Sequence, residues 1–471
     1  MKKGEENKDP LSKAGNPGAE SSPTGSPEKT GEKTAPSKET TGYVVLAALL
    51  IYLGWGLINT DGNLILILSG PITSTLHLSL QQYSYVISGG FFASFVVSLI
   101  LGPLGDRLGR RFILQFTLVG TAFFSMLQYF INGFLSWFGI RLAAGAFTGG
   151  EWGAGSTLLS EVVGKRLRGL ALSIMQSGWV FGYGLASAIA LFTISTFGPT
   201  YGWRVAFLFA FLPALLVLLL RGLKLKDSTR FEHLKAVREA KKRGDTETLN
   251  RLLQQYSVNV NQLGRGQYGQ LLAKDLRRTT LVLAFWNFLT TGIAITANSF
   301  QPIYFQDVKG FPYVELATMF TVVSFAGIIG YIINGVLNDW IGAKYSIIIF
   351  ALIESIGIYL LTFDVAHSLL TLYAYYILFF FTENGQFSAL VRLNSEAFPT
   401  RVRATGAIWG GAFWSLGQAV WPLLFAALIP ALSFNGAWLW VEVVPELLGL
   451  VILGVVMKNI PPRKELEEIA I

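Results

Sequence analysis

The sequence predicts an all-α integral membrane protein with twelve transmembrane helices in two pseudo-symmetric six-helix bundles. Of its 471 residues, 52% are hydrophobic and only 14% are charged, whereas about a quarter of the residues of an ordinary soluble protein are charged. Twelve apolar stretches are long enough to cross a bilayer, which takes about 20 helical residues. Two charged motifs of the first half also recur in the second half, which indicates a duplicated unit.

The apolar stretches predict helices rather than strands. Each is two to three times longer than the roughly ten residues of a transmembrane barrel strand, and none shows the apolar-polar alternation of such a strand. The stretches cover residues 43–69, 83–104, 112–131, 135–160, 169–197, 201–221, 279–305, 312–337, 345–363, 368–394, 403–429 and 436–457.

These stretches divide the chain into five regions. Residues 1–41 contain almost no apolar side chains, so they are expected to form a disordered cytoplasmic tail that cannot bury enough surface to become ordered. Residues 42–221 and 279–458 are expected to form the two six-helix bundles. A central cytoplasmic loop is expected at 222–278 and a second cytoplasmic tail at 459–471.

The central loop carries a dense mix of charges and is expected to contain two short helices, at about 230–243 and 246–256. Thr229 and Glu232 have the spacing of a capping box, and Gly244 interrupts the pattern between the two helices. A solvated linker is the simpler interpretation of this loop, and a regulatory lid is the alternative.

The distribution of basic residues predicts that both termini are cytoplasmic. Nearly all of the 37 Lys and Arg residues fall in segments on the N-terminal side of the membrane, and Lys309 is the sole basic residue of the opposite loops. Short basic loops are retained in the cytoplasm during membrane insertion. The net charge of +8 therefore requires no nucleic-acid partner, because the positive charge faces anionic lipid.

Two charged motifs recur at distances of 233 and 235 residues. The first repeat pairs Gly102, Asp106 and Gly109 of GPLGDRLGRR with Gly335, Asp339 and Gly342 of GVLNDWIGAK. The second repeat pairs Glu161, Arg166 and Arg168 of EVVGKRLRG with Glu396, Arg401 and Arg403 of EAFPTRVRATG. Two independent motifs displaced by half of the membrane-spanning region indicate a duplicated six-helix unit.

These motifs also resemble those of a known family. GPLGDRLGRR resembles the inner-loop signature of the major facilitator superfamily (MFS), and RLAAGAFTGG resembles its fourth-helix signature. GGEWGAGSTLLSE, QSGWVFGYGLAS and FPTRVRATG are similar to the metabolite:proton symporters for sialate, lactate and other organic acids within that family. The resemblance covers all twelve stretches and implies the MFS fold, with transport by alternating access.

The resemblance implies that the charged motifs form a cytoplasmic gate whose ion pairs stabilise the outward-open state. The second copy has Ala343 in place of Arg110, so Lys344 is its sole base at that turn and its latch is expected to be the weaker one. Topology marking combined with helix capping is the alternative interpretation. The expected gate residues are Gly102, Asp106, Arg107, Gly109, Arg110, Arg111, Glu161, Arg166, Arg168, Gly335, Asp339, Gly342, Lys344, Glu396, Arg401 and Arg403.

Ionisable residues inside the predicted spans are candidates for proton coupling. Asp61 and Arg141 lie at similar depths below the outer ends of the first and fourth stretches, so we expect them to pair. A lone ionisable side chain in a bilayer costs at least about 2.5–3.5 kcal/mol. The resemblance implies the same pair, because related proteins carry an acid and this Arg at the matching positions.

The first stretch departs from the DGxD pattern that is frequent in the family, because Leu64 replaces the second acid. Because this second acid is absent, Glu151, ten residues beyond Arg141, becomes a further candidate for the proton-coupling acid. An acid beside a movable Arg can hold and release a proton, so Asp61 or Glu151, with Arg141, is expected to couple transport to protons. A purely structural buried pair is the alternative.

Polar and aromatic side chains within the apolar stretches are expected to line a substrate cavity. Trp152 projects within about 20° of Arg141 when each helical residue turns by 100°, although packing against lipid or core explains a Trp equally well. The expected cavity residues are Arg141, Trp152, Gln176, Trp179, Tyr183, Asn298, Gln301, Glu383 and Gln386.

These features predict a secondary active transporter of the cell membrane that moves a small organic anion, such as a monocarboxylate or sugar acid, by proton symport. A proton-coupled carrier of a neutral sugar, a drug/proton exporter, a channel and a receptor are the alternatives. The expected partners are a small-molecule substrate, protons and the lipid bilayer, and the chain is expected to be monomeric.

Several classes of chemistry are disfavoured by the sequence. The chain has no HExxH, GxSxG or Walker A motif, which argues against an enzyme and against an ATP-driven pump. It also has no Cys, so a thiolate metal site is excluded, and neither a cofactor nor a metal is expected.

Overall fold

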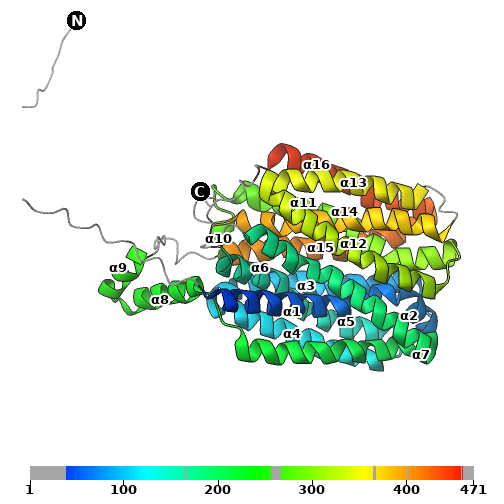
Figure 1. The fold of residues 1–471 in the computed structure, drawn as a ribbon, viewed down its shortest axis with the longest axis horizontal. Helices are drawn as coiled ribbons and strands as arrows, with labels where there is room; N and C mark the ends of the chain where they lie inside the picture. The colour runs from blue at the N-terminus through cyan, green and yellow to red at the C-terminus, as the bar shows by residue number, and fades with distance from the viewer. Residues whose placement is uncertain are drawn as a thin grey trace, which may run out of the picture.

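The computed structural model describes residues 39–164, 167–255, 267–363, 368–399, 402–457 and 459. Long helices run side by side through most of this part of the chain (Figure 1). The predicted gate residues Arg166 and Arg401 lie outside the described residues, as do nearly all of the two predicted tails.

The first half of the chain forms six spans, of which two are interrupted. The α1 and α2 helices make the first span, α5 and α6 make the fourth, and α7 contains both the fifth and the sixth because Gly198 breaks it with φ 75°. The helices are α1 (Thr41–Ile67), α2 (Ser69–Leu76), α3 (Leu80–Leu108), α4 (Arg110–Leu127), the 3-10 turn η1 (Gln128–Phe130), α5 (Phe134–Thr148), α6 (Glu151–Val162) and α7 (Arg168–Lys224).

The second half also forms six spans, but its fourth span is one continuous helix. Its fifth and sixth spans are again one long helical segment, which is broken at Ser433 with φ 60°. The helices are α11 (Arg277–Ile303), the π-helix η3 (Tyr304–Val308), α12 (Tyr313–Ile341), α13 (Ala343–Phe363), α14 (Leu369–Glu396), α15 (Arg403–Trp438), the π-helix η4 (Leu439–Val443) and α16 (Val444–Val456).

Eight helical segments of the described residues are long and apolar enough to cross a membrane. Two of them, α7 and the segment Thr405–Val456, contain two spans each because of the breaks at Gly198 and Ser433. The α5 and α6 helices are too short to count singly, and α14 carries polar residues in its middle. With these two additional spans, the described segments account for the twelve predicted helices.

Glycine closes the same turn in both halves. Gly109 joins α3 to α4 with φ 104°, and Gly342 joins α12 to α13 with φ 86°. A side chain at such a positive φ is strained, so only glycine fits without cost. The repeated Gly of the two sequence motifs is therefore explained by the backbone of the turn.

The halves meet along two pairs of helices. The α3 helix packs along α15, and α7 packs along α12. Gly335 of α12 lies directly against Ser173 of α7, which brings the two backbones close together. Each contact joins an element of the first half to an element of the second, so relative movement of the halves must occur along these two seams.

The central connection contains α8 (Thr229–Arg243), α9 (Thr246–Gln255) and α10 (Gln267–Leu271). The α8 and α9 helices project beyond one end of the bundle, which we call the connection end (Figure 1). The N-cap of α8 is Ser228, whose hydroxyl accepts the Phe231 N–H. The cap is thus one residue earlier than the Thr229 that the sequence pattern suggested.

Candidate functional site

A cavity with a volume of about 150 Å³ lies between the two halves. This is the size of an apolar cavity that holds a benzene ring. Aromatic side chains form much of its wall, together with neutral polar groups from both halves. Of the acids and bases, only Asp61 and Arg141 belong to its described lining. The aromatic lining residues are Trp55, Phe91, Trp152, Trp179, Tyr331, Phe387 and Trp414.

Asp61 and Arg141 form the buried ion pair that the sequence predicted. Arg141 Nη1 lies 3.0 Å from Asp61 Oδ2, and the Gln128 side chain donates to Asp61 Oδ1 at 2.7 Å. Trp137 donates in turn to Gln128 Oε1 at 3.3 Å, which orients the amide. Arg141 Nε is buried without a hydrogen-bond partner among the described residues. The guanidinium therefore retains a donor for an anion.

Glu151 lies outside the cavity lining and away from the Asp61–Arg141 pair. It pairs with Arg221, whose Nη2 is 2.6 Å from Glu151 Oε1, and it accepts the Thr117 hydroxyl at 2.5 Å. It does not belong to the cavity lining, whereas the adjacent Trp152 does. Neighbouring positions of a helix point about 100° apart, so one of the two faces the cavity and the other faces the interior of its own bundle.

Arg221 binds four groups of the first half. Its Nε donates to Leu50 O at 3.1 Å and its Nη1 to Leu114 O at 2.9 Å, while Nη2 donates to Glu151 and, at 3.4 Å, to Ile51 O. The side chain is fully buried. It therefore joins α1, α4, α6 and α7 around the Glu151 carboxylate.

The other predicted cavity residues divide into two groups. Trp152, Gln176, Trp179 and Asn298 line the cavity, and Trp152 donates to Gln176 Oε1 at 2.7 Å. The remaining four lie behind the lining, where they make contacts within or between helices. These four are Tyr183, Gln301, Glu383 and Gln386.

The sequence analysis missed Trp55, Asn59, Tyr331 and Phe387, which also line the cavity. The first two share one face of α1 with the lining residues Gly62 and Leu66, at spacings of three or four residues. This spacing is a helical stripe. The signal was present, but a Trp or an amide in a membrane helix has several other uses.

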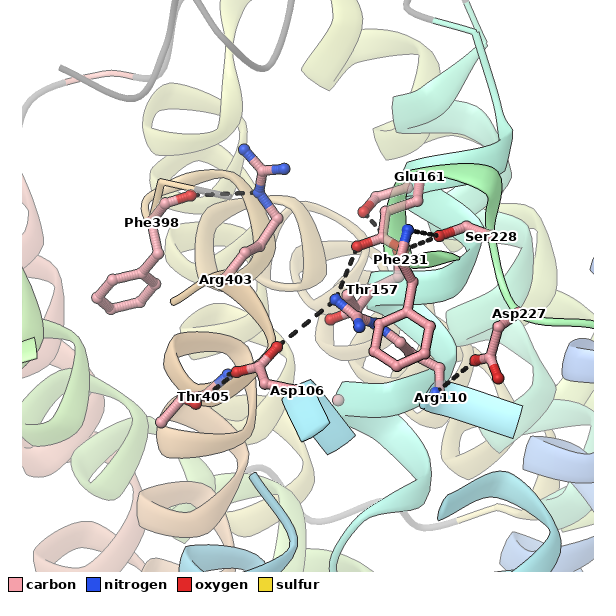
Figure 2. A network of polar contacts seen from close by, with 12 residues as sticks. Asp106, Arg110, Thr157, Glu161, Asp227, Ser228, Phe231, Phe398, Arg403 and Thr405 are labelled. Atoms are coloured by element: carbon pink, nitrogen blue, oxygen red, sulfur yellow. Dashed lines mark hydrogen bonds and ion pairs between the residues drawn. The ribbon is translucent and has the colours of Figure 1, made fainter. Parts of the chain in front are cut away.

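Charged residues of the repeated motifs, among them Asp106, Arg110 and Glu161, form a network of polar contacts with the start of the central connection (Figure 2). Asp106 joins the two halves, because its Oδ2 accepts the Thr405 hydroxyl at 2.6 Å and the Thr405 N–H at 3.2 Å. Arg110 lies 2.9 Å from Glu161 and 3.5 Å from Asp106. All three charged side chains are about 2% exposed, so water screens their attraction little.

The central connection packs on this network. Asp227 Oδ1 accepts the backbone N–H groups of Arg110 at 2.6 Å and Arg111 at 3.0 Å, which caps the start of α4. Ser228 donates to Glu161 at 2.5 Å, and Arg238 of α8 donates to the Asp106 carbonyl (Figure 2 shows the Ser228 contact). The beginning of the connection is thus bound to the bundle.

The second copy of the motif uses a different base. Arg392 of α14 lies 3.1 Å from Asp339 and 3.0 Å from Glu396. Lys344 instead donates to the carbonyls of Gly454 and Met457, at 2.6 and 2.9 Å. Arg392 was not among the predicted gate residues, because it lies within an apolar stretch without a counterpart in the repeat.

The remaining predicted gate residues take up varied positions. Arg168 reaches across the halves to Glu396 at 3.9 Å, and Arg403 donates to Phe398 O at 3.2 Å. Arg111 donates to Gly222 O at 2.6 Å, whereas Arg107 is exposed at the end of α3. The connection end is thus joined across the halves by the contacts of Asp106 and Arg168.

Comparison with known proteins agrees with this architecture. The family model "Major Facilitator Superfamily" matches residues 44–353 and 315–470. The solved structure of the proton:xylose symporter XylE bound to 6-bromo-6-deoxy-D-glucose superimposes with a TM-score of 0.72. It covers 92% of this chain and 99% of its own, at 17% identity, and so shows a shared fold.

Two curated bacterial relatives are similar over most of their length. The putative niacin/nicotinamide transporter NiaP of Bacillus subtilis (strain 168) is 27% identical over 80% of this chain and 86% of its own. The probable 4-methylmuconolactone transporter of Cupriavidus pinatubonensis (strain JMP 134 / LMG 1197) is 27% identical over 75% of this chain and 76% of its own. The chain therefore belongs to the Major Facilitator Superfamily and is a multi-pass membrane transporter of a small molecule rather than an enzyme.

Proposed function

We propose that this transporter is a proton symporter for a small ring compound that carries one carboxylate. The observation that carries the proposal is the Asp61–Arg141 pair, which supplies the acid and the base of an otherwise neutral, aromatic cavity. The cavity has room for one six-membered ring. The relatives named for niacin/nicotinamide and for 4-methylmuconolactone support this class, because niacin and 4-methylmuconolactone each combine a ring with a carboxylate.

Competition for Arg141 links the proton to the substrate. While Asp61 is ionised it occupies the guanidinium, and a proton on Asp61 removes that charge and frees the guanidinium for the substrate carboxylate. Arg141 Nε, which has no partner among the described residues, is the first available donor. One proton and one monovalent anion then share the cavity with no net change in its charge.

Alternating access requires the contacts between the halves to open at one end at a time. Asp106 and Thr405 join the halves at the connection end, and Tyr83 donates to Ser299 O at 3.5 Å toward the opposite end. With the connection end assigned to the cytoplasm, the Asp106 contact is the inner gate. Substrate and proton shift the equilibrium only to the extent that they bind its two states unequally.

Transport by purified protein in liposomes tests the proposal. Nicotinate should accumulate when the pH gradient drives protons inward, whereas nicotinamide, its uncharged amide, and xylose should not. A thermal-shift screen of ring carboxylates, other organic acids and sugars at two pH values selects the best ligand first, since a ligand stabilises the state it binds. Equal accumulation without the pH gradient, or stabilisation by neutral sugars alone, would contradict the proposal.

Asp61→Asn separates coupling from binding. This variant should lose gradient-driven accumulation but retain exchange of labelled for unlabelled substrate, which needs no net proton movement. Asp245→Asn is the matched control, because Asp245 is an exposed acid of the central connection and should leave both activities intact. Normal accumulation by Asp61→Asn would reject the assignment of the proton to this residue.

A further inference from the structure

Besides Glu396, which pairs with Arg392, the described residues of the second half include four buried acids outside the cavity lining. They are Glu354 of α13, Glu383 of α14, Glu442 of η4 and Glu446 of α16, which we call the carboxyl cluster; each is at most 1% exposed. Within the described residues no Lys or Arg contacts any of them. The substrate site proposed above makes no use of these four carboxyl groups.

The carboxyl groups are near one another. Glu354 lies within electrostatic range of Glu446, Glu383 and Glu442. Gln386 of α14 links two of them, since its Nε2 donates to Glu354 Oε2 and its side chain also lies against Glu446. Four carboxylates at this spacing, without a cation, would repel one another strongly in a medium of low dielectric constant.

The hydrogen bonds of the cluster are incomplete. Among the described residues, no donor binds either carboxyl oxygen of Glu446, Oε1 of Glu354 or Oε2 of Glu442, and all four oxygens are buried. The same holds for Oε1 of Gln386, a neutral acceptor that is 1% exposed and belongs to the cluster. An ionised carboxylate cannot supply a donor to an amide oxygen, but a protonated carboxyl can. These acceptor oxygens therefore need a hydrogen-bond donor, and a proton on one of the carboxyl groups supplies it.

Glu383 differs from the other three because both of its oxygens have donors. The Asn298 amide donates to Oε1 at 3.1 Å and the Asn384 amide donates to Oε2 at 3.3 Å. Such donors favour the ionised form. Asn298 lines the cavity, and so does Tyr331, whose buried hydroxyl lies within electrostatic range of Glu383. Glu383 is thus the member of the cluster that is linked to the cavity lining, through its hydrogen bond from Asn298.

We propose that the carboxyl cluster is a second proton-binding site, separate from Asp61–Arg141, which exchanges protons with the cavity through Glu383. Because Glu383 lies behind the lining, a hydronium ion in the cavity gives its proton to the Tyr331 hydroxyl and is left as water, while that hydroxyl passes its own proton to an oxygen of the Glu383 carboxylate; the reverse steps return the proton. The titratable groups around Glu383 are the carboxyls of Glu354 and Glu442 and the phenols of Tyr183, Tyr331 and Tyr376. The use of this proton in transport rests on the proposed function, but the proton occupancy does not.

Infrared spectroscopy of the ligand-free protein in lipid nanodiscs tests the occupancy directly. The carbonyl stretch of protonated carboxyl groups should be present at neutral pH and should shift after transfer to D2O. Glu446→Gln and Glu354→Gln should each remove part of this band. Glu151→Gln is the matched control, because Glu151 is equally buried but paired with Arg221, and it should leave the band unchanged.

Two results would overturn the proposal. The first is a wild-type protein without the protonated band at neutral pH, a measurement that needs no variant to fold. The second is stabilisation of the wild type by Na⁺ but not K⁺, abolished by Glu383→Gln, which would make the cluster a sodium site instead. Neither result depends on the substrate, so neither can be confused with a failure to transport ring carboxylates.

Transport measurements then test the use of the proton. Glu383→Gln should lose most of the gradient-driven accumulation of the ligand selected by the screen, while exchange of labelled for unlabelled ligand continues. Gradient-driven accumulation at the wild-type level would restrict the cluster to a static role and reject the exchange through Glu383.

Discussion

At the connection end both halves of the protein pair a buried acid with an Arg, but elsewhere the two halves accommodate their buried acids in opposite ways. In the first half, Asp61 and Glu151 each face an Arg, at 3.0 and 2.6 Å. In the second half, the four acids of the carboxyl cluster have no basic partner among the described residues. The duplication preserved the helices and the glycine turns but not the charge of the interior.

This difference separates two uses of a buried carboxyl group. An Arg beside a buried acid makes the pair a structural element, as at Arg221, unless a competitor can reach the Arg, as at Arg141. An acid without a cation must be neutral or bind one, because an isolated charge in a bilayer is expensive. Away from the connection end, the first half therefore pairs its buried acids with Arg, and the second half buries acids for which a proton is the available positive partner.

The largest effect is expected from Arg221→Met, which breaks the pairing of the first half. Removing one partner of a buried pair costs about 3–5 kcal/mol, because the remaining charge is left unpaired. The melting temperature in detergent, followed by tryptophan fluorescence, should fall sharply. Arg243→Met is the control, since the Arg243–Glu239 pair is exposed and such pairs contribute about 0–1 kcal/mol. An unchanged melting temperature for Arg221→Met would remove the structural contrast between the halves.

Arg141→Gln sharpens the distinction between the two Arg residues of the first half. If Arg141 binds the substrate carboxylate, losing a charged hydrogen bond worth about 1.5–3 kcal/mol should weaken nicotinate binding about tenfold to a hundredfold. Calorimetric titration measures this, and nicotinamide serves as the uncharged comparison ligand. Equal losses for both ligands would mean that Arg141 shapes the cavity without binding the carboxylate.

Asp106→Asn tests the seam between the halves. The loss of a charged acceptor for Thr405 should raise the population that is open at the connection end by about tenfold, which corresponds to about 1.4 kcal/mol. Because the chain has no cysteine, a Ser388→Cys thiol is the one site for maleimide labelling. Its hydroxyl counterpart is buried against Ser173 at 3.1 Å, so labelling should accelerate when the halves part. An unchanged labelling rate would contradict a gating role for Asp106.

The smallest effect is expected from Glu446→Gln. If Glu446 is already neutral, the amide changes neither size nor charge, and stability should change by no more than about 1 kcal/mol. The same substitution at Glu151 leaves Arg221 without its counterion and should cost clearly more. Comparing the two melting temperatures measures the contrast between the halves directly, and equal losses would refute it.

The sequence analysis was accurate where the signal is local. The lengths of the apolar stretches predicted the spans, and the repeated motifs predicted the duplicated halves. Depth along a helix follows from counting residues, so the pairing of Asp61 with Arg141 was also predictable. Arg392 was missed for the converse reason, because a single base in an apolar run shows neither a repeat nor a partner.

The direction in which a side chain points around its helix axis was harder to predict from the sequence. The sequence placed Glu151 beside the cavity because it lies on the same span as Arg141, but it faces Arg221, seventy residues further along the chain. Glu383 and Gln386 were expected at the cavity wall and lie behind it. Each of these outcomes depends on which neighbouring helix a face packs against.

Chain composition, run length and repeat spacing determine a twelve-helix membrane protein with a duplicated half and charges concentrated at helix ends. These properties are local, because hydrophobic length and turn geometry act within a few residues. The packing of helices that are distant in sequence decided which buried acids contact an arginine. The same packing decided which buried acids have only a proton as a positive partner. A charge in a medium of low dielectric constant is governed by the groups within a few ångströms, and only the folded chain brings those groups together.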